Sequence, residues 1–155
     1  MSTTATSGST ATRTSAAPFA AFLARRPVWQ ANYLAALAAG AAVEVWGLAA
    51  RLAGVPMRVA GPGSHHASSI TVGMFAMATM VVTFWFTFAV VLIARFANNP
   101  MRIYLRTTLP LLAVSFAIPL TAADTAASTK LTLVAAHLIA AAIIIPAIAR
   151  RLRAE

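Results

Sequence analysis

The chain has 155 residues, of which 60% are hydrophobic and only 10% are charged. A soluble domain carries about 25% charged residues, so this composition excludes an ordinary soluble protein. Cysteine is absent, which excludes disulfide bonds, thiol catalysis and cysteine-ligated metals. The net charge of +9 does not indicate nucleic-acid binding, because the basic residues lie at the ends of apolar stretches, where they orient helices in a bilayer.

The N-terminal segment, residues 1–17, is rich in Ser, Thr and Ala and has a single charged residue. Such a segment cannot bury a core, so we expect a disordered tail ahead of one membrane domain over residues 18–153. Within residues 18–29, apolar side chains lie beside Arg25 and Arg26. This pattern fits either a short helix on the membrane surface or a basic flank before the first span.

Four apolar stretches follow, each long enough to cross a bilayer as a helix. A hydrocarbon core ~30 Å thick needs about 20 apolar residues at a rise of ~1.5 Å per residue. The expected spans cover, to within a few residues, 31–53, 70–94, 103–122 and 131–149. They are continuous apolar blocks without the alternation of barrel strands. The predicted fold class is therefore all-α, a four-helix transmembrane bundle.

The spans contain three prolines, Pro110, Pro119 and Pro146. Membrane helices tolerate proline because neighbouring helices and side chains take up the freed carbonyl groups, so we expect kinks at these positions. The connections between spans are short. The longest, residues 54–69, is rich in Gly and Pro and is expected to form turns.

The basic residues alternate between the two ends of the expected spans. Nine of the twelve flank the N-terminus, the second loop or the C-terminus: Arg13, Arg25, Arg26, Arg95, Arg102, Arg106, Arg150, Arg151 and Arg153. The other three are Arg51, Arg58 and Lys130. Since cytoplasmic flanks carry the excess of Lys and Arg, both termini are expected in the cytoplasm of a multi-pass protein of the cell inner membrane. Trp29, Tyr33 and Tyr104 then fall near the cytoplasmic interface, where amphipathic rings gather.

Two ionisable side chains, Glu44 and His137, lie well inside the spans. A charge at the bilayer centre costs ~2.5–3.5 kcal/mol on insertion scales, so such residues face the bundle interior and need a partner. Counted from the expected span ends at the helical rise, they lie roughly 12 Å and 10 Å from the outer edge. Thr79 and Ser115 reach a similar depth. We therefore predict an intramembrane polar layer made of Glu44, His137, Ser115 and Thr79.

The face of the first span that carries Glu44 also carries Gly40 and Gly47, small residues that let helices approach closely. Two interpretations follow. In the first, the polar layer is a hydrogen-bonded knot that sets helix register, with Glu44 paired to His137 or protonated. In the second, it is a proton-linked or cation-binding site of a small transporter. The lack of a second acid within the spans, which a relay needs, favours the first.

No sequence pattern points to catalysis. The histidine pair His65 and His66 has no Cys or acid at metal-ligand spacing. No phosphate-binding loop, dinucleotide fingerprint, zinc-protease helix or serine elbow is present. We therefore expect no catalytic residue, no cofactor, no metal site and no enzyme activity.

Several short segments carry a resemblance to a known family. They are Gly54-Val55-Pro56-Met57-Arg58-Val59, Ser115 to Leu120, Ala136-His137-Leu138-Ile139, Ile145-Pro146-Ala147 and Arg150-Arg151. From Gly54 to Arg151 the chain resembles a family of small actinobacterial membrane proteins classed as a domain of unknown function. The resemblance implies four helices and an inner-membrane location, and it transfers no catalytic residue. An acid in the first of four helices is also similar to small multidrug exporters, whose other motifs are missing.

The expected role is that of a membrane scaffold or accessory subunit, held together by small residues and the polar layer. The alternative is a proton-coupled small-molecule transporter that works through Glu44, as an oligomer because four thin helices enclose little space. The expected partners are the lipid bilayer and either a second copy of the chain or another membrane protein, with no nucleic acid.

Overall fold

A computed structural model describes residues 21–23, 25–61 and 66–153. The expected tail of residues 1–17 and His65 of the histidine pair lie outside these ranges. The helices are α2 (Val28–Leu52), α3 (Met74–Phe96), α4 (Pro100–Ser115), α5 (Ala117–Thr121) and α6 (Ala127–Arg153), and the strands are β1 (Arg58–Ala60) and β2 (Ala67–Ser69). Four segments are long and apolar enough to cross a membrane: α2, α3, α4 together with α5, and α6. The all-α, four-helix class is confirmed.

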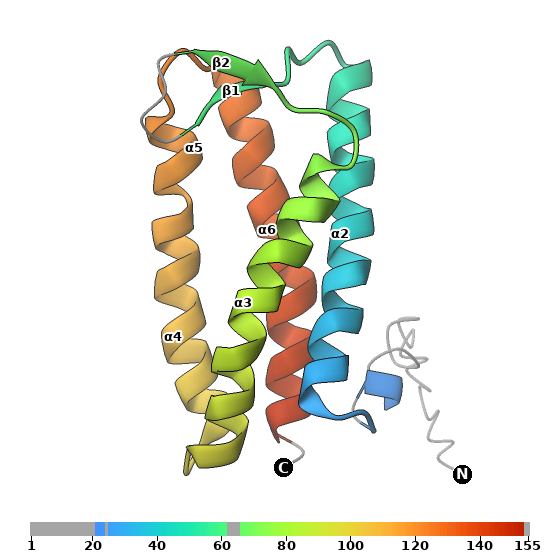
Figure 1. Ribbon diagram of the computed structural model, residues 1–155, viewed down its shortest axis with the longest axis vertical. Coiled ribbons are helices and arrows are strands. Elements are labelled where there is room, and N and C mark those ends of the chain that lie inside the picture. The colour runs from blue at the N-terminus through green and yellow to red at the C-terminus, as the bar shows by residue number, and fades with distance from the viewer. Residues whose placement is uncertain (1–20, 24, 62–65, 154–155) are drawn as a thin grey trace, which may run out of the picture.

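Helix α2 is the most extensively buried of the four spans, and it packs against both α3 and α6. Its buried faces are built from small residues, and four of its alanines are fully buried: Ala31, Ala35, Ala36 and Ala39. Alanine and glycine let neighbouring backbones approach closely, which is how membrane helices gain packing energy without a hydrophobic driving force. Helix α4 packs chiefly against α6 and lies at the edge of the bundle (Figure 1).

The third span is divided into α4 and a short helix, α5, that begins after Phe116. Pro119 has no N–H to offer the Ser115 carbonyl four residues earlier, so the hydrogen-bond ladder is interrupted there. The Phe116 N–H bonds instead to Ala113 O at 3.3 Å, a tighter turn. Helices α4 and α6 continue through Pro110 and Pro146. Of the three prolines, Pro119 is thus the one at which a helix breaks.

The connection after α2 forms a small antiparallel hairpin, whereas the sequence predicts only turns there. Arg58 pairs with Ser69, and Ala60 pairs with Ala67. The Ala60 N–H also donates to Thr125 Oγ1 at 3.3 Å, which ties the hairpin to the turn between α5 and α6. The hairpin therefore covers one end of the bundle and links the first half of the chain to the second (Figure 1).

The start of α2 and the end of α6 lie together at the opposite end of the bundle (Figure 1). Leu23, in the helical residues 21–23, is buried against a cluster that includes Leu152 and Tyr104. Arg151 Nε donates to Arg26 O at 2.7 Å and joins the two chain segments. Tyr104 is only 1% exposed, so its ring is buried in the core at this end of the bundle.

Two glycines of α2 form the contact surface, or seam, with α3. A Cβ atom at Gly40 would lie 3.5 Å from Ala76 Cα, an ordinary van der Waals distance. A Cβ atom at Gly47 would lie 2.7 Å from the ring of Phe75, which is itself buried. The close approach expected on the glycine face of the first span is therefore made by α3 of the same chain.

The two glycines predict opposite effects of the same substitution. Gly40→Ala should match or exceed the parent in thermal stability, because alanine improves helix propensity by ~1 kcal/mol. Gly47→Ala should lower the melting temperature, because crowding against Phe75 costs about 1–3 kcal/mol and outweighs that gain. Thermal unfolding in detergent, followed by tryptophan fluorescence, measures both. Equal melting temperatures for the two variants would contradict a tight seam at Gly47.

Candidate functional site

Glu44 lies on α2 beside the first turn of α3. Its Oε1 accepts a hydrogen bond from the Gly73 N–H at 2.7 Å, and its Oε2 accepts one from the Ala76 N–H at 3.3 Å. The first N–H groups of a helix have no partner within the helix, and α3 has no capping side chain of its own. Glu44 therefore caps α3 from a different helix, and its carboxylate stands at the positive end of the α3 dipole.

The chain before α3 is shaped to reach this carboxylate. Gly73 has φ = +90°, a left-handed conformation that glycine adopts without a steric penalty. Two turns beyond Glu44, Arg51 Nη2 donates to Ile70 O at 2.6 Å. Two side chains of α2 thus bind the segment that leads into α3. The Arg51 guanidinium group binds a carbonyl group, and the Glu44 carboxylate binds N–H groups.

His137 is bound within its own helix. Its Nδ1 lies 2.8 Å from Leu133 O, to which the Nδ1–H tautomer donates. Its ring meets the ring of Phe116 edge-on, with centroids 6.1 Å apart. His137 therefore faces the break between α4 and α5, whereas Glu44 faces α3. Among the described residues no hydrogen bond or ion pair joins Glu44 to His137.

The two hydroxyl groups of the predicted layer are also satisfied locally. Thr79 Oγ1 donates to Phe75 O at 2.8 Å, and Ser115 Oγ donates to Leu112 O at 2.7 Å. Thr79 lies six residues after Gly73, roughly 9 Å further along α3 than the groups that Glu44 caps. Across the part of the chain that the structure describes, the four predicted residues are not linked to one another by hydrogen bonds.

A buried polar contact that the sequence did not single out joins α2 to α3 near their arginine-rich ends. Asn32, only 2% exposed, donates from Nδ2 to Thr87 Oγ1 at 2.9 Å. Thr87 Oγ1 in turn donates to Thr83 O at 2.7 Å. The available signal was that Asn32 lies on the same helical face as the buried Ala35, Ala36 and Ala39.

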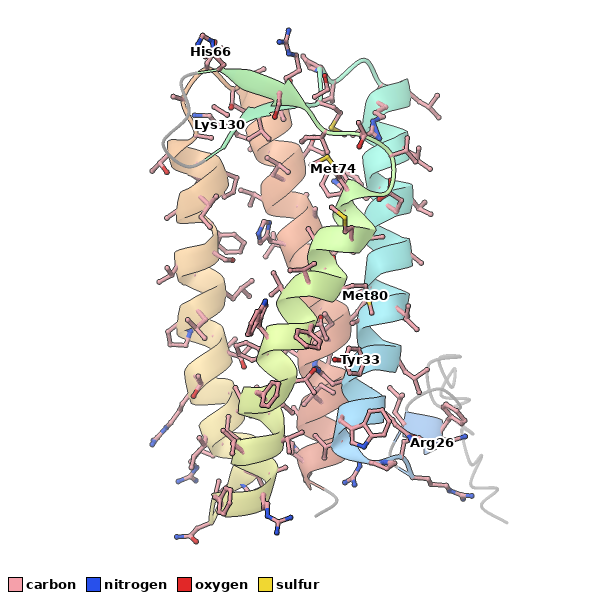
Figure 2. The ribbon with its side chains drawn as sticks, viewed as in Figure 1. Arg26, Tyr33, His66, Met74, Met80 and Lys130 are labelled. Atoms are coloured by element: carbon pink, nitrogen blue, oxygen red, sulfur yellow. The ribbon has the colours of Figure 1, made fainter. Side chains whose placement is uncertain are left out.

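Two further contacts close the hairpin end of the bundle. Trp46 Nε1 donates to Thr132 O at 3.1 Å, which joins α2 to α6. Lys130 Nζ donates to Leu120 O at 3.1 Å and so caps the carbonyl end of α5. Figure 2 shows Lys130 and His66 at this end of the bundle and Arg26 at the other.

Two shallow cavities on the described surface are lined by residues other than Glu44 and His137. One, of about 540 Å³, lies between the hairpin and the α5–α6 turn and includes Arg58 and Asp124. The other, of about 400 Å³, lies along α4.

The model of a family of unknown function, DUF6069, matches residues 23–154. The chain belongs to this family. The match includes all four apolar helices, so the first helix, with Glu44, is part of the family domain. No curated protein and no solved structure matches the chain.

The cap predicts a graded loss of stability. Glu44→Ala should lower the free energy of unfolding by about 0.5–2 kcal/mol, the usual cost of losing a capping side chain. Glu44→Gln should lower it less, because the amide keeps one oxygen acceptor. Asp124→Asn is the charge-matched control: Asp124 is exposed, and this variant should behave as the parent. Thermal unfolding in detergent measures all three, and a parent-like Glu44→Ala would show that the cap contributes nothing.

The Asn32–Thr87 contact predicts a measurable coupling energy. In a double-mutant cycle of Asn32→Ala and Thr87→Val, the coupling should fall near ~0.6 kcal/mol and below ~1.7 kcal/mol, the range found between membrane helices. Thr107 is the control, because it is exposed and its hydroxyl bonds to Ile103 O of its own helix. Asn32→Ala and Thr107→Val should be additive within about 0.5 kcal/mol. Additivity in the first cycle as well would overturn the contact.

Proposed function

We propose that the chain is a membrane scaffold or accessory subunit without enzyme activity, in which Glu44 is a structural cap. The proposal places it in the inner membrane of an actinobacterial cell, as the sequence resemblance implies. Its partners are the bilayer and either a second copy of the chain or another membrane protein.

The environment of Glu44 is the observation that carries the proposal. Both carboxylate oxygens already accept backbone hydrogen bonds, which is the acceptor role of an ionised carboxylate. A proton carrier has to release such bonds at each turnover, which would uncap α3 every time.

The outer surface of the bundle supports the expectation of partners. Trp85 is 71% exposed and Phe88 is 67% exposed, and both lie on α3. On α4, Tyr104 is the buried residue. Apolar surface of this extent needs hydrocarbon or another helix against it.

The distribution of arginine supports a cytoplasmic position for both termini. The described basic residues at the end where α2 begins are Arg25, Arg26, Arg95, Arg102, Arg106, Arg150, Arg151 and Arg153, whereas the hairpin end carries Arg51, Arg58 and Lys130. An excess of this kind marks the cytoplasmic side of a multi-pass protein.

Reconstitution into liposomes with an internal pH dye separates this proposal from proton-coupled transport. Under an imposed pH gradient, the parent and Glu44→Gln should both leak protons at the rate of protein-free liposomes. A proton flux that appears with the parent and disappears in Glu44→Gln would overturn the proposal and establish the transporter alternative.

The scaffold role is tested in cells with a photo-crosslinking residue at Trp85, which is exposed, or at Ala36, which is fully buried. Crosslinking to a protein, either a second copy or a heterologous subunit, is expected from position 85 and not from position 36. Crosslinking of position 85 to lipid alone would contradict a scaffold.

A further inference from the structure

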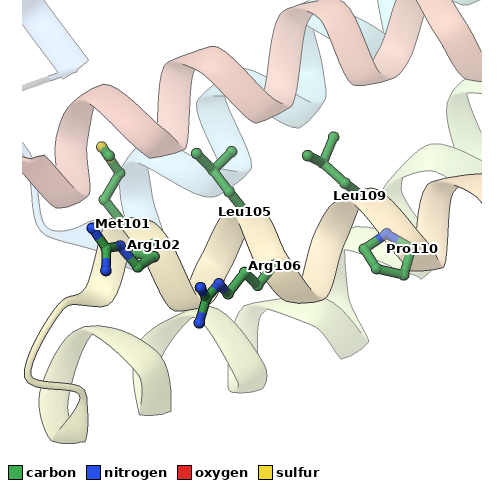
Figure 3. Close-up of a pocket in the computed structure, with 6 residues that line it drawn as sticks. All are labelled: Met101, Arg102, Leu105, Arg106, Leu109 and Pro110. Atoms are coloured by element: carbon green, nitrogen blue, oxygen red, sulfur yellow. The ribbon is translucent and has the colours of Figure 1, made fainter.

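The groove along α4 is built from two rows of side chains. Met101, Leu105 and Leu109 form one row and project toward the neighbouring helix (Figure 3). Arg102, Arg106 and Pro110 form the second row, offset by one residue. Residues four apart lie above one another on a helix, so the groove has a continuous apolar row beside a pair of guanidinium groups one turn apart. Its volume of about 400 Å³ is within the usual range for small-molecule sites.

The two guanidinium groups have no anion within the described protein. The acidic residues in the described ranges are Glu44 and Asp124. Glu44 caps α3, and Asp124 lies in the turn between α5 and α6, so both are toward the hairpin end. A third cation enters the same region, because Arg153 Nε lies 3.3 Å from Met101 Sδ. Within the described ranges, the mouth of the groove therefore gathers positive charge with no carboxylate beside it.

The position of the groove in a membrane restricts what can compensate this charge. Arg106 lies six residues after Pro100, roughly 9 Å along the helix. Arg102 and Arg106 are both exposed on the outside of the bundle, where lipid lies in a membrane. Arginines near a helix end extend toward the headgroup level, and basic pockets on membrane helices bind anionic headgroups.

We propose that this groove binds an anionic phospholipid. The phosphate lies between Arg102 and Arg106 with Arg153 nearby, because guanidinium groups bind phosphate oxygens through paired hydrogen bonds. One acyl chain lies along Met101, Leu105 and Leu109. A free phosphate ion would use the arginines but would not cover the exposed part of this row, chiefly Leu109, which is why a lipid fits the site better.

Native mass spectrometry of the full chain tests the site. The protein, purified in detergent, is mixed with phosphatidylglycerol or with phosphatidylcholine of the same acyl chains. The parent should retain phosphatidylglycerol in preference. The double variant Arg102→Gln/Arg106→Gln should retain about thirtyfold less, given the contribution of each of the two arginines near a membrane surface.

A matched control removes the same charge elsewhere at this end of the bundle. Arg95 and Arg150 are exposed and do not line the groove, so Arg95→Gln/Arg150→Gln should retain phosphatidylglycerol as the parent does. An equal loss of phosphatidylglycerol in both double variants would show that general surface charge, and not the groove, retains the lipid, and it would overturn the site. Full retention by Arg102→Gln/Arg106→Gln would overturn it as well.

Two further arms identify the ligand. Inorganic phosphate and glycerol 3-phosphate, which lack acyl chains, should not displace the bound lipid, and displacement by either would show an ion site instead. Leu109→Ala should weaken lipid retention, because it shortens the apolar row, and unchanged retention would contradict the acyl-chain contact. If the glutamine variant fails to fold, Arg102→Lys/Arg106→Lys replaces it. This variant keeps the charge but loses the paired hydrogen bonds of the guanidinium groups, so it should retain less lipid than the parent.

Discussion

The pair of hydrogen bonds from the first turn of α3 to Glu44 joins the start of one helix to the side of another. The first N–H groups of a helix have no partner within that helix, so Glu44 supplies acceptors that the start of α3 lacks. The contacts around Glu44 depend on the same placement of α3: Phe75 lies over Gly47, and Arg51 binds the Ile70 carbonyl. A single face of α2 therefore determines where α3 begins.

The polar side chains of the bundle divide into two groups with different consequences. Among the residues that the structure describes, one group donates hydrogen bonds to carbonyl groups of its own helices and makes none to a neighbouring helix: Thr79, Ser115 and His137. Contacts that cross between helices are made by Glu44, by Asn32 with Thr87, and by Trp46 with Thr132 O. These three contacts begin on α2, the most extensively buried of the spans, whereas Lys130 and Arg153 of α6 reach α5 and α4.

Hydropathy predicted the four helices and the basic end of the bundle, because both follow from the cost of placing charge in hydrocarbon. The partner of Glu44 was not predictable in this way. Residues 70–73 are mostly apolar or small, and the sequence places them within the second span, yet α3 begins only at Met74. The burial of Tyr104 was not predictable for a similar reason. An aromatic ring near a helix end can lie either at the membrane interface or in the core, and hydropathy does not distinguish these two positions. Strands of three residues are too short to show alternation, which is why the hairpin was missed.

The level at which α3 begins also affects the surrounding membrane. Glu44 lies eight residues before the end of α2 at Leu52, so α2 extends roughly 12 Å past the first turn of α3. The lipids of that leaflet therefore contact an apolar surface that reaches higher beside α2 than beside α3. A bilayer that matches both surfaces is thinner beside α3 than beside α2. Differences in thickness of this kind bring together proteins that share them. In a membrane, a neighbour with the same difference in height would relieve this strain, so the difference favours such neighbours.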